Sequence, residues 1–487
     1  MQLTRRYLLK CAAASAAITA SQTEVFHSEA RAQVKSPNEK LGVAVVGAGG
    51  RGSSHLSAFA GGSDSDVLYI VDVDKNQQGK IAGVEKKQGF APKFEQDMRR
   101  VLDDPRVDCI STATPNHWHS LISIWALQAG KHVYVEKPVS HNVWEGRQLT
   151  NWARKQNLIV QCGTQSRSSP SLKEAVQFVR EGKLGKIQHV IGTCYKPRKS
   201  IGKLDKPLVI PDSIDYDLWC GPAAKVDLYR PKLHYDWHWD FNTGNGDMGN
   251  QGIHQMDISR WFLGEQELSP RIMSIGGRLG YDDAGNTPNT QIVYHAYEKA
   301  PLLFETRGLP SKDLDWKNGM DNYRGSQIGV IVQCEQGYVV VPSYTSATAF
   351  DNDGNVVKKW SGGGDHFGNF LDAVRSGNRD DLNAEVLEGH LSSALCHTGA
   401  ISHMLGKPQA KSDIEAAVSS DPLWADSFQR MAAHLDANGV DISGPSVSVG
   451  PWLEMDPASE TFKNNDAANA LLTRNYREGY VVPGVEA

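Results

Sequence analysis

The sequence predicts an α/β protein with two folded domains: an N-terminal domain on a doubly wound parallel sheet, and a C-terminal α+β domain with an open, mostly antiparallel sheet. Short apolar runs alternate with helix-like stretches over residues 38–165, as right-handed β-α-β crossovers require. A glycine-rich turn directly follows the first apolar run. Beyond residue 166, strand-like runs follow one another without regular helices between them, which is typical of antiparallel sheets.

Five short apolar runs are the predicted strands of the first domain. They are continuous rather than alternating, because helices cover both faces of a parallel sheet. Helix-like stretches lie between them. The predicted strands are Leu41–Val46, Val67–Val71, Val107–Ala113, Val133–Val135 and Leu158–Cys162, and the predicted helices are Ser53–Ala60, Gln96–Leu102, Ser120–Ala129 and Trp144–Lys155.

The second predicted domain covers residues 166–410, and residues 411–487 are predicted to be a less regular C-terminal extension. Aromatic residues alternate with polar ones from Tyr235 to Phe241, and this period of two predicts a further strand. The alternating rings are either a sugar-stacking face or one buried strand face. The other predicted strands are Ile187–Tyr195, Gln291–Tyr297, Leu302–Thr306, Ile328–Gln333 and Tyr338–Pro342, and the predicted helices are Ser171–Arg180, His366–Arg375, Glu385–Leu405 and Asp466–Leu472.

Composition excludes several classes of protein. The 487 residues carry 51 Lys and Arg against 56 Asp and Glu, a formal charge of -5, so the chain has no basic footprint for nucleic acid. No run reaches the roughly 18 apolar residues that a membrane-spanning helix needs. Seven cysteines are too few for a disulfide scaffold and none has metal-ligand spacing, so we expect buried thiols and no metal site.

The N-terminus has the features of an export signal. Arg5 and Arg6 precede a weakly apolar stretch of small residues, and Ala30-Arg31-Ala32 is a candidate cleavage site. We therefore predict a Tat signal over residues 1–32, with the Tat translocase as a partner and the periplasm as the destination. A frayed amphipathic helix is the alternative.

A glycine-rich loop follows the first predicted strand and precedes a predicted helix. In this context GxGxxG predicts a Rossmann nucleotide site, in which the helix N-terminus meets the pyrophosphate. Asp72 ends the next strand, where a carboxylate accepts both ribose hydroxyls of NAD and repels a 2′-phosphate. Val73 follows it rather than Arg, so NAD is favoured over NADP. The predicted loop residues are Gly47, Gly49, Gly50, Arg51 and Gly52.

Three further motifs carry a family resemblance. Glu136-Lys137-Pro138 and Thr114–His119 each follow a predicted strand, and Gly249–Asp257 contains a central His254. With the glycine loop and Asp72, they resemble the Gfo/Idh/MocA oxidoreductases. The resemblance covers residues 41–408 and implies a Rossmann domain, an α/β domain that lines the substrate site, and a homo-oligomer. It implies cofactor contacts from Thr114, Pro115, Asn116, His119, Glu136 and Lys137.

The same resemblance assigns the chemistry. Lys137 matches the family's catalytic lysine, which suits a proton relay if burial lowers its pKa. His254 matches the catalytic histidine. Asn250 stands where the family often has Asp, so the usual Lys/Asp/His relay is in question, and Asp247 or Asp257 could substitute.

Substrate contacts and function are predicted more coarsely. We expect Arg167, Tyr195, Asn250 and His254 to bind substrate. The leading hypothesis is an NAD-dependent oxidoreductase acting on a hydroxyl of a sugar, sugar derivative or cyclitol, with tightly held, internally recycled NAD. A glycosidase working by oxidation, elimination, hydration and reduction is one alternative, and a non-catalytic sugar-binding protein is another. The sequence does not specify the substrate.

Overall fold

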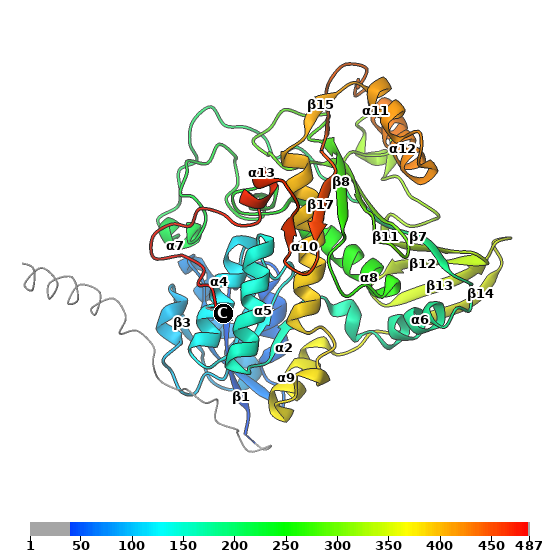
Figure 1. Cartoon of the computed structure of the whole chain (residues 1–487). Helices are drawn as coiled ribbons and strands as arrows, with labels where there is room; N and C mark the ends of the chain where they lie inside the picture. The colour runs from blue at the N-terminus through cyan, green and yellow to red at the C-terminus, as the bar shows by residue number, and fades with distance from the viewer. Residues whose placement is uncertain (1–38, 486–487) are drawn as a thin grey trace, which may run out of the picture.

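Two sheets form the frame of the protein in the computed structural model, which describes residues 39–485 (Figure 1). The predicted Tat signal over residues 1–32 lies outside the described residues. The first sheet has six parallel strands in the order β3-β2-β1-β4-β5-β6, as a doubly wound fold requires. Its strands are β1 Leu41–Val46, β2 Ser65–Val71, β3 Lys93–Glu95, β4 Cys109–Thr112, β5 His132–Val135 and β6 Val160–Cys162.

Helices cover both faces of this first sheet. Along β1, Val43 and Val45 pack in the same cluster as Phe59, whereas Ala44 and Val46 pack on the opposite side with Leu121. This alternation of buried side chains explains why the strand is apolar throughout. The helices of this part of the chain are α2 Gly52–Phe59, α3 Ile81–Gln88, α4 His119–Gln128 and α5 Val143–Gln156, and α9 His366–Ser376 joins the face that carries α2.

The second sheet has twelve strands and is antiparallel except where β10 pairs with β7. The main path runs β14-β13-β12-β11-β7-β10-β9-β8-β16-β15, and β17 pairs with β8 and β18. The strands are β7 Ile187–Tyr195, β8 Arg271–Gly277, β9 Thr290–His295, β10 Leu302–Arg307, β11 Ile328–Cys334, β12 Gly337–Ser343, β13 Ser346–Asp351, β14 Val356–Ser361, β15 Lys407–Gln409, β16 Val447–Val449, β17 Leu453–Asp456 and β18 Thr461–Phe462. The predicted fold class is therefore confirmed.

Helices also cover both faces of the second sheet. One cluster joins Val293 of β9 to residues of α6, α8 and α10, and the other joins Ile292 to residues of α11 and α12. Residues 411–437 thus complete the second core. Figure 1 shows α10 running between the two sheets. The helices are α6 Pro170–Arg180, α7 Tyr216–Cys220, α8 Ile253–Leu263, α10 Val386–Met404, α11 Lys411–Val418, α12 Pro422–Ala437 and α13 Asp466–Ala470.

Two predicted elements are wrong. The stretch 96–102 forms a 3-10 turn, Met98–Val101, which follows the short strand β3, instead of a helix. The aromatic alternation from Tyr235 to Phe241 is a 3-10 turn over Asp236–Trp239 instead of a strand. The reason is local: Tyr235 has a φ of 66°, and its carbonyl accepts hydrogen bonds from both the backbone N–H and the ring of His238.

A segment of the second domain crosses over the first. This cover segment, residues 208–242, has a small apolar core of its own that also contacts Val73. The backbone N–H of Lys75 donates to Ser213 O at 2.9 Å, and that of Asp215 donates to Val73 O at 3.0 Å. These bonds fasten the cover segment to the end of β2.

The tail segment, residues 471–485, returns to the first domain and holds the cover segment in place (Figure 1). Arg474 Nη1 donates to Asn242 O at 2.9 Å. Arg477 Nη1 donates to Asp217 O at 3.0 Å and its Nη2 donates to Asp217 Oδ1 at 2.5 Å. The Tyr480 ring lies 5.6 Å from that of Trp118, so the tail bridges both domains.

The six cysteines within residues 39–485 are free and buried, as predicted. In the same range, no helix combines the length and the apolar character needed to cross a membrane.

Candidate active site

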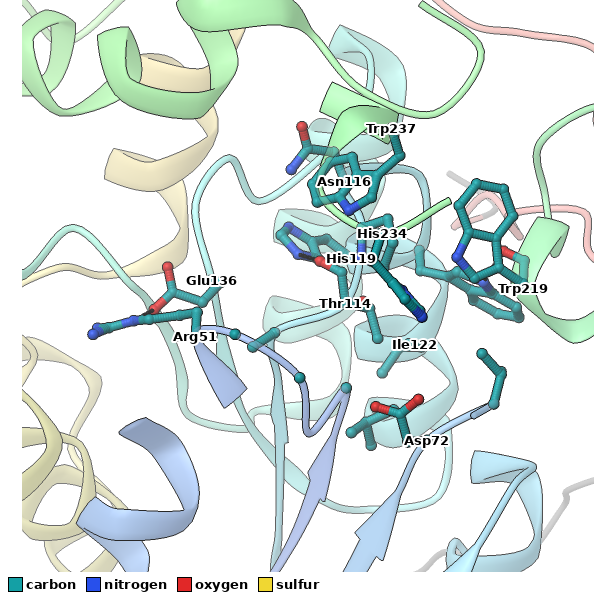
Figure 2. A pocket seen from close by; sticks show the side chains of 18 of the residues that line it. Arg51, Asp72, Thr114, Asn116, His119, Ile122, Glu136, Trp219, His234 and Trp237 are labelled. Carbon is teal, nitrogen blue, oxygen red and sulfur yellow. Dashed lines mark hydrogen bonds and ion pairs between the residues drawn. The ribbon is translucent and has the colours of Figure 1, made fainter. Parts of the chain in front are cut away.

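A cavity of about 560 Å³ lies at the carboxyl ends of the first sheet's strands, where doubly wound sheets bind their ligands. Figure 2 shows Asp72 on one side, the Arg51–Glu136 pair on another, and Trp237 of the cover segment on the wall that faces them. The cavity is thus enclosed by both domains. It runs from the glycine loop to Lys137.

The glycine loop has the shape of a phosphate cradle. Gly47 has a φ of 81°, and its N–H donates to Val71 O at 2.8 Å. A Cβ on Gly52 would lie 1.8 Å from the carbonyl oxygen of Gly47, so only glycine fits there. Gly49 and Gly50, in contrast, have open space where a Cβ would be. The N-terminus of α2 opens on this space, so the loop fits the pyrophosphate of a dinucleotide.

Asp72 lines the cavity beside this loop. Its Oδ2 accepts from Ala48 N at 2.8 Å and its Oδ1 accepts from Asp74 N at 3.0 Å. Burial raises its pKa, and the two backbone donors oppose that shift. Each oxygen retains accepting capacity toward the cavity, so the carboxylate fits ribose hydroxyls.

The motif after β4 supplies the next wall. Thr114, Pro115, Asn116 and His119 all line the cavity. The His119 ring lies between two carbonyl oxygens, with Nδ1 2.6 Å from Pro138 O and Nε2 2.8 Å from Thr114 O. His119 therefore joins the two motifs that follow β4 and β5.

Glu136 anchors the end of β5. Its Oε1 accepts from Arg51 Nε at 2.7 Å and lies 3.1 Å from His55 Nε2. Burial alone would raise its pKa, but His55 and Arg51 hold the pKa of Glu136 well below its usual range. The carboxylate stays charged and fixes Arg51 of the glycine loop beside Lys137.

Lys137 lies at the far end of the cavity. Its Nζ donates to the backbone carbonyl of Asn250 at 2.8 Å. Burial lowers its pKa, Glu136 opposes this, and Arg51 and Lys196 reinforce it. A lysine with a lowered pKa can exchange a proton with a hydroxyl.

His254 and Asn250 lie one helical turn apart. Asn250 belongs to a π-type turn, Met248–Gly252, and lines the cavity. His254 is the second residue of α8 and is not among the lining residues; it is buried, and its ring lies 4.6 Å from that of Tyr344. Its Nδ1 has no hydrogen-bond partner within residues 39–485. Burial and the positive charge of Lys137 hold the pKa of His254 well below its ordinary value.

His238 of the cover segment is a cavity residue that motif reasoning does not assign. Its ring stacks on Trp237 at 3.6 Å. Burial, together with Lys137 and Arg198, lowers the pKa of His238 to about 3, so the imidazole is neutral near pH 7. The aromatic alternation marks this segment in the sequence, although the wrong secondary structure was inferred from it.

Two predicted substrate residues lie outside the cavity lining. Arg167 forms a buried ion pair with Asp257 at 2.8 Å and a second with Glu388 at 3.0 Å. Tyr195 is buried and donates to Glu305 Oε2 at 2.5 Å. The structure therefore brings Lys137 and Asn250 together and leaves these two side chains engaged elsewhere.

The carboxylates considered as substitutes for the family's Asp are also engaged. Asp257 is held by Arg167, and Asp247 pairs with Arg198 at 2.6 Å. The group that contacts Lys137 is the backbone carbonyl of Asn250. Within residues 39–485, no three His, Cys, Asp or Glu side chains gather as a metal site requires.

Curated relatives match part of the chain. A levoglucosan dehydrogenase of Pseudarthrobacter phenanthrenivorans is 23% identical over 241 residues, 48% of this chain and 54% of the relative. A glycosyl hydrolase family 109 protein of Shewanella pealeana is 28% identical over 208 residues, 39% of this chain and 45% of the relative. The chain spans 54%, 56% and 57% of the length of three curated relatives that it matches.

Solved structures and family profiles agree on the fold. The aldose-aldose oxidoreductase of Caulobacter crescentus has a TM-score of 0.54 at 17% identity, over 74% of this chain and 98% of that chain. The profile of the oxidoreductase family's NAD-binding Rossmann fold matches residues 41–164, and that of its C-terminal alpha/beta domain matches residues 181–308. Together they cover just over half of the chain, which therefore belongs to the Gfo/Idh/MocA family of NAD-binding oxidoreductases.

Proposed function

We propose that the protein is an NAD-dependent oxidoreductase that acts on a hydroxyl of a sugar, sugar derivative or cyclitol. The observation that carries this is one continuous cavity with the glycine loop and Asp72 at one end and Lys137 and Asn250 at the other. The first pair fits a dinucleotide, and the second pair offers a proton acceptor and an amide at the reacting end.

The chain's own residues handle binding and the proton. The loop 47–52 and Asp72 would hold the dinucleotide, which when bound would supply the hydride acceptor for oxidation of the substrate carbon. Lys137 Nζ takes the proton that leaves the hydroxyl, because burial favours its neutral form. Lys137 in turn is positioned by the Asn250 carbonyl. Neutral His238 can bind a second hydroxyl.

Retained NAD is part of the proposal. The cover segment lines the cavity opposite the first sheet, and the tail segment fastens the cover segment through Arg474 and Arg477. A cofactor held this way must regain its starting oxidation state in each cycle, by returning the hydride to the same substrate or to a second carbonyl. We further propose export through the Tat translocase to the periplasm, for which such retention is suited.

The substrate class rests on cavity chemistry and on relatives. Trp237 and Tyr235 offer aromatic surface to a ring, and Asn250 and His238 offer polar groups to its hydroxyls. Matching relatives include an inositol 2-dehydrogenase of Saccharopolyspora erythraea, 30% identical over 155 residues, and the levoglucosan dehydrogenase. We also propose a homo-oligomer, supported by edge strand β14, which exposes Val356 and Val357.

A glycosidase that oxidises, eliminates, hydrates and reduces is the second candidate. The match to the glycosyl hydrolase family 109 protein favours it. This candidate also requires that the hydride is returned to the substrate in each cycle and that Lys137 accepts the proton.

The test begins with the purified protein. Mass spectrometry after denaturation should find one NAD or NADH per chain. Incubation with levoglucosan, inositols and aryl glycosides, without added NAD, then distinguishes the candidates: release of the aryl alcohol indicates the glycosidase, and a carbonyl product indicates the oxidoreductase. Turnover that needs stoichiometric added NAD contradicts cofactor retention. Absence of nucleotide binding contradicts the whole proposal.

A further inference from the structure

Two lysine side chains contact one turn at the reacting end of the cavity, which Lys137 lines and Lys196 does not. Lys137 Nζ donates to the carbonyl oxygen of Asn250 at 2.8 Å. Lys196, the residue after β7, donates to Gln251 Oε1 at 3.0 Å. Asn250 and Gln251 are neighbours in one π-type turn, so the two lysines approach consecutive residues of the same element from different domains.

The other charges near this turn are already compensated. Arg51 pairs with Glu136 at 2.7 Å, and Arg198 pairs with Asp247 at 2.6 Å. For Lys137 and Lys196, no carboxylate oxygen of residues 39–485 lies within the 4.0 Å that defines an ion pair. Their hydrogen-bond acceptors are neutral amide oxygens. The positive charge of Lys196 therefore has no carboxylate partner within residues 39–485.

The positive charge of Lys196 affects the titration of two other groups near this turn. Burial lowers the pKa of Lys137, Glu136 opposes this shift, and Arg51 and Lys196 reinforce it. Lys196 also contributes to the lowered pKa of His254. Like charges in a partly desolvated site repel one another, and a bound anion relieves this repulsion.

We propose that the substrate of this site is an anionic sugar, and that Lys196 binds its carboxylate while Lys137 meets the reacting hydroxyl. The inference rests on the proposed oxidoreductase function and deepens it. Lys196 is then a specificity residue: it touches the acid group and not the carbon that is oxidised. A carboxylate matches it by charge and by the three N–H donors of an ammonium. A sugar phosphate shares this chemistry and is the alternative source of the anion.

The experiment uses the purified protein with its bound NAD and matched pairs of sugars. Glucuronate against glucose, galacturonate against galactose, and glucose 6-phosphate against glucose differ only at carbon 6. Reduction of the bound NAD is followed by absorbance in a single turnover, and binding by quenching of tryptophan fluorescence. We expect the acid of at least one pair to bind and react about tenfold or more better than its neutral partner, and the advantage to shrink as salt is added.

Variants of Lys196 and Lys199 test whether Lys196 causes the preference for the acidic sugar. Lys196→Gln should bring the ratio of the acid's rate to the neutral sugar's rate down towards one, and Lys196→Arg should restore most of that ratio. Lys199→Gln is the matched control, since Lys199 is an exposed lysine three residues further on, and it should change neither rate. Retained NAD and an unchanged melting temperature exclude a folding defect, and the salt dependence of the unaltered protein tests the same charge without any variant.

The possible outcomes separate the two proposals. Equal or better reaction of the neutral sugars overturns the anionic-substrate inference and leaves the oxidoreductase function standing. A preference for the phosphate alone assigns the anion to a sugar phosphate rather than to a sugar acid. If no sugar of either kind reduces bound NAD, the oxidoreductase proposal fails, and the inference fails with it.

Discussion

The carboxylate of Asp72 accepts a hydrogen bond from the backbone N–H of Ala48 at 2.8 Å. Asp72 ends β2, and Ala48 lies inside the glycine loop after β1. One side chain that faces the ribose position therefore also fixes the loop that faces the pyrophosphate position. This bond couples the two halves of the dinucleotide site.

Replacing Asp72 with Ser should weaken NAD binding about 10- to 100-fold, because a charged acceptor and the bond to Ala48 are both lost. NADP should lose less affinity, since the variant no longer repels a 2′-phosphate. Titration calorimetry on protein freed of nucleotide measures both constants. Equal losses for the two cofactors would place the ribose away from Asp72.

Two glycines of the loop should respond in opposite ways to alanine. Gly49→Ala points its Cβ into the open space of the cavity, so the melting temperature should be unchanged and NAD affinity should fall. Gly52→Ala places its Cβ 1.8 Å from the Gly47 carbonyl, so the fold itself should be destabilised. Thermal denaturation and nucleotide content distinguish the two; similar melting losses in both variants would contradict the assignment of the open space to the cofactor.

Lys137→Met should reduce turnover about 10²- to 10⁴-fold, the range typical of a lost proton acceptor, while NAD stays bound. It should also stabilise the fold at neutral pH. The folded-state pKa of Lys137 is lowered below 10.5 by burial, so the unfolded chain binds the proton more tightly, and stability rises with pH between the lowered pKa and 10.5. The gain in melting temperature should therefore shrink as the pH approaches 10.5. A melting temperature lower than that of the unaltered protein at pH 7 would contradict the conclusion that the buried, protonated Lys137 destabilises the fold.

Asn250→Asp should move the pH dependence of oxidation to higher pH. The rate should rise with pH as Lys137 loses its proton, and this limb should lie below 10.5 because burial lowers that pKa. A carboxylate on the residue whose carbonyl Lys137 contacts favours the ammonium form and raises the pKa. Rate profiles of single-turnover NAD reduction measure the shift. If the pH at which the rate rises were the same in the variant, the rise would reflect the titration of a group other than Lys137.

Arg477→Met should release bound nucleotide. The guanidinium donates to the Asp217 carbonyl and carboxylate, and to the Gly221 carbonyl at 3.2 Å, so its loss loosens the cover segment. Nucleotide content after extensive dialysis should fall severalfold. Arg379→Met, at an exposed arginine distant in sequence from the cover, is the control and should retain the cofactor. Full retention in both variants would show that the tail does not hold the cover.

The first domain could be predicted from the sequence because its signals are local. β1, the glycine loop and Asp72 follow one another within about 30 residues. A strand that is apolar throughout indicates that helices cover both faces of its sheet. The motif around Lys137 was also found locally, at the end of a strand. Its geometry relative to Asn250 depends on a contact across 113 residues, and the family resemblance rather than any periodicity connected them.

The remaining differences come from partners that are distant in sequence. Arg167 looked available for substrate, but its partner Asp257 is 90 residues away. Tyr195 likewise meets Glu305 across 110 residues. In the segment from Tyr235 to Phe241, one positive φ and local hydrogen bonds outweighed the alternation that predicts a strand.

The link between Arg477 and Asp217 joins residues that are 260 positions apart in the chain. During synthesis the cover segment emerges from the ribosome long before the tail segment that fastens it. Until residues 474–480 have been made, none of these bonds can form, and the cover segment lacks the hydrogen bonds from Arg474 and Arg477. The order of translation therefore leaves the cover segment unfastened until the last residues of the tail segment have been made.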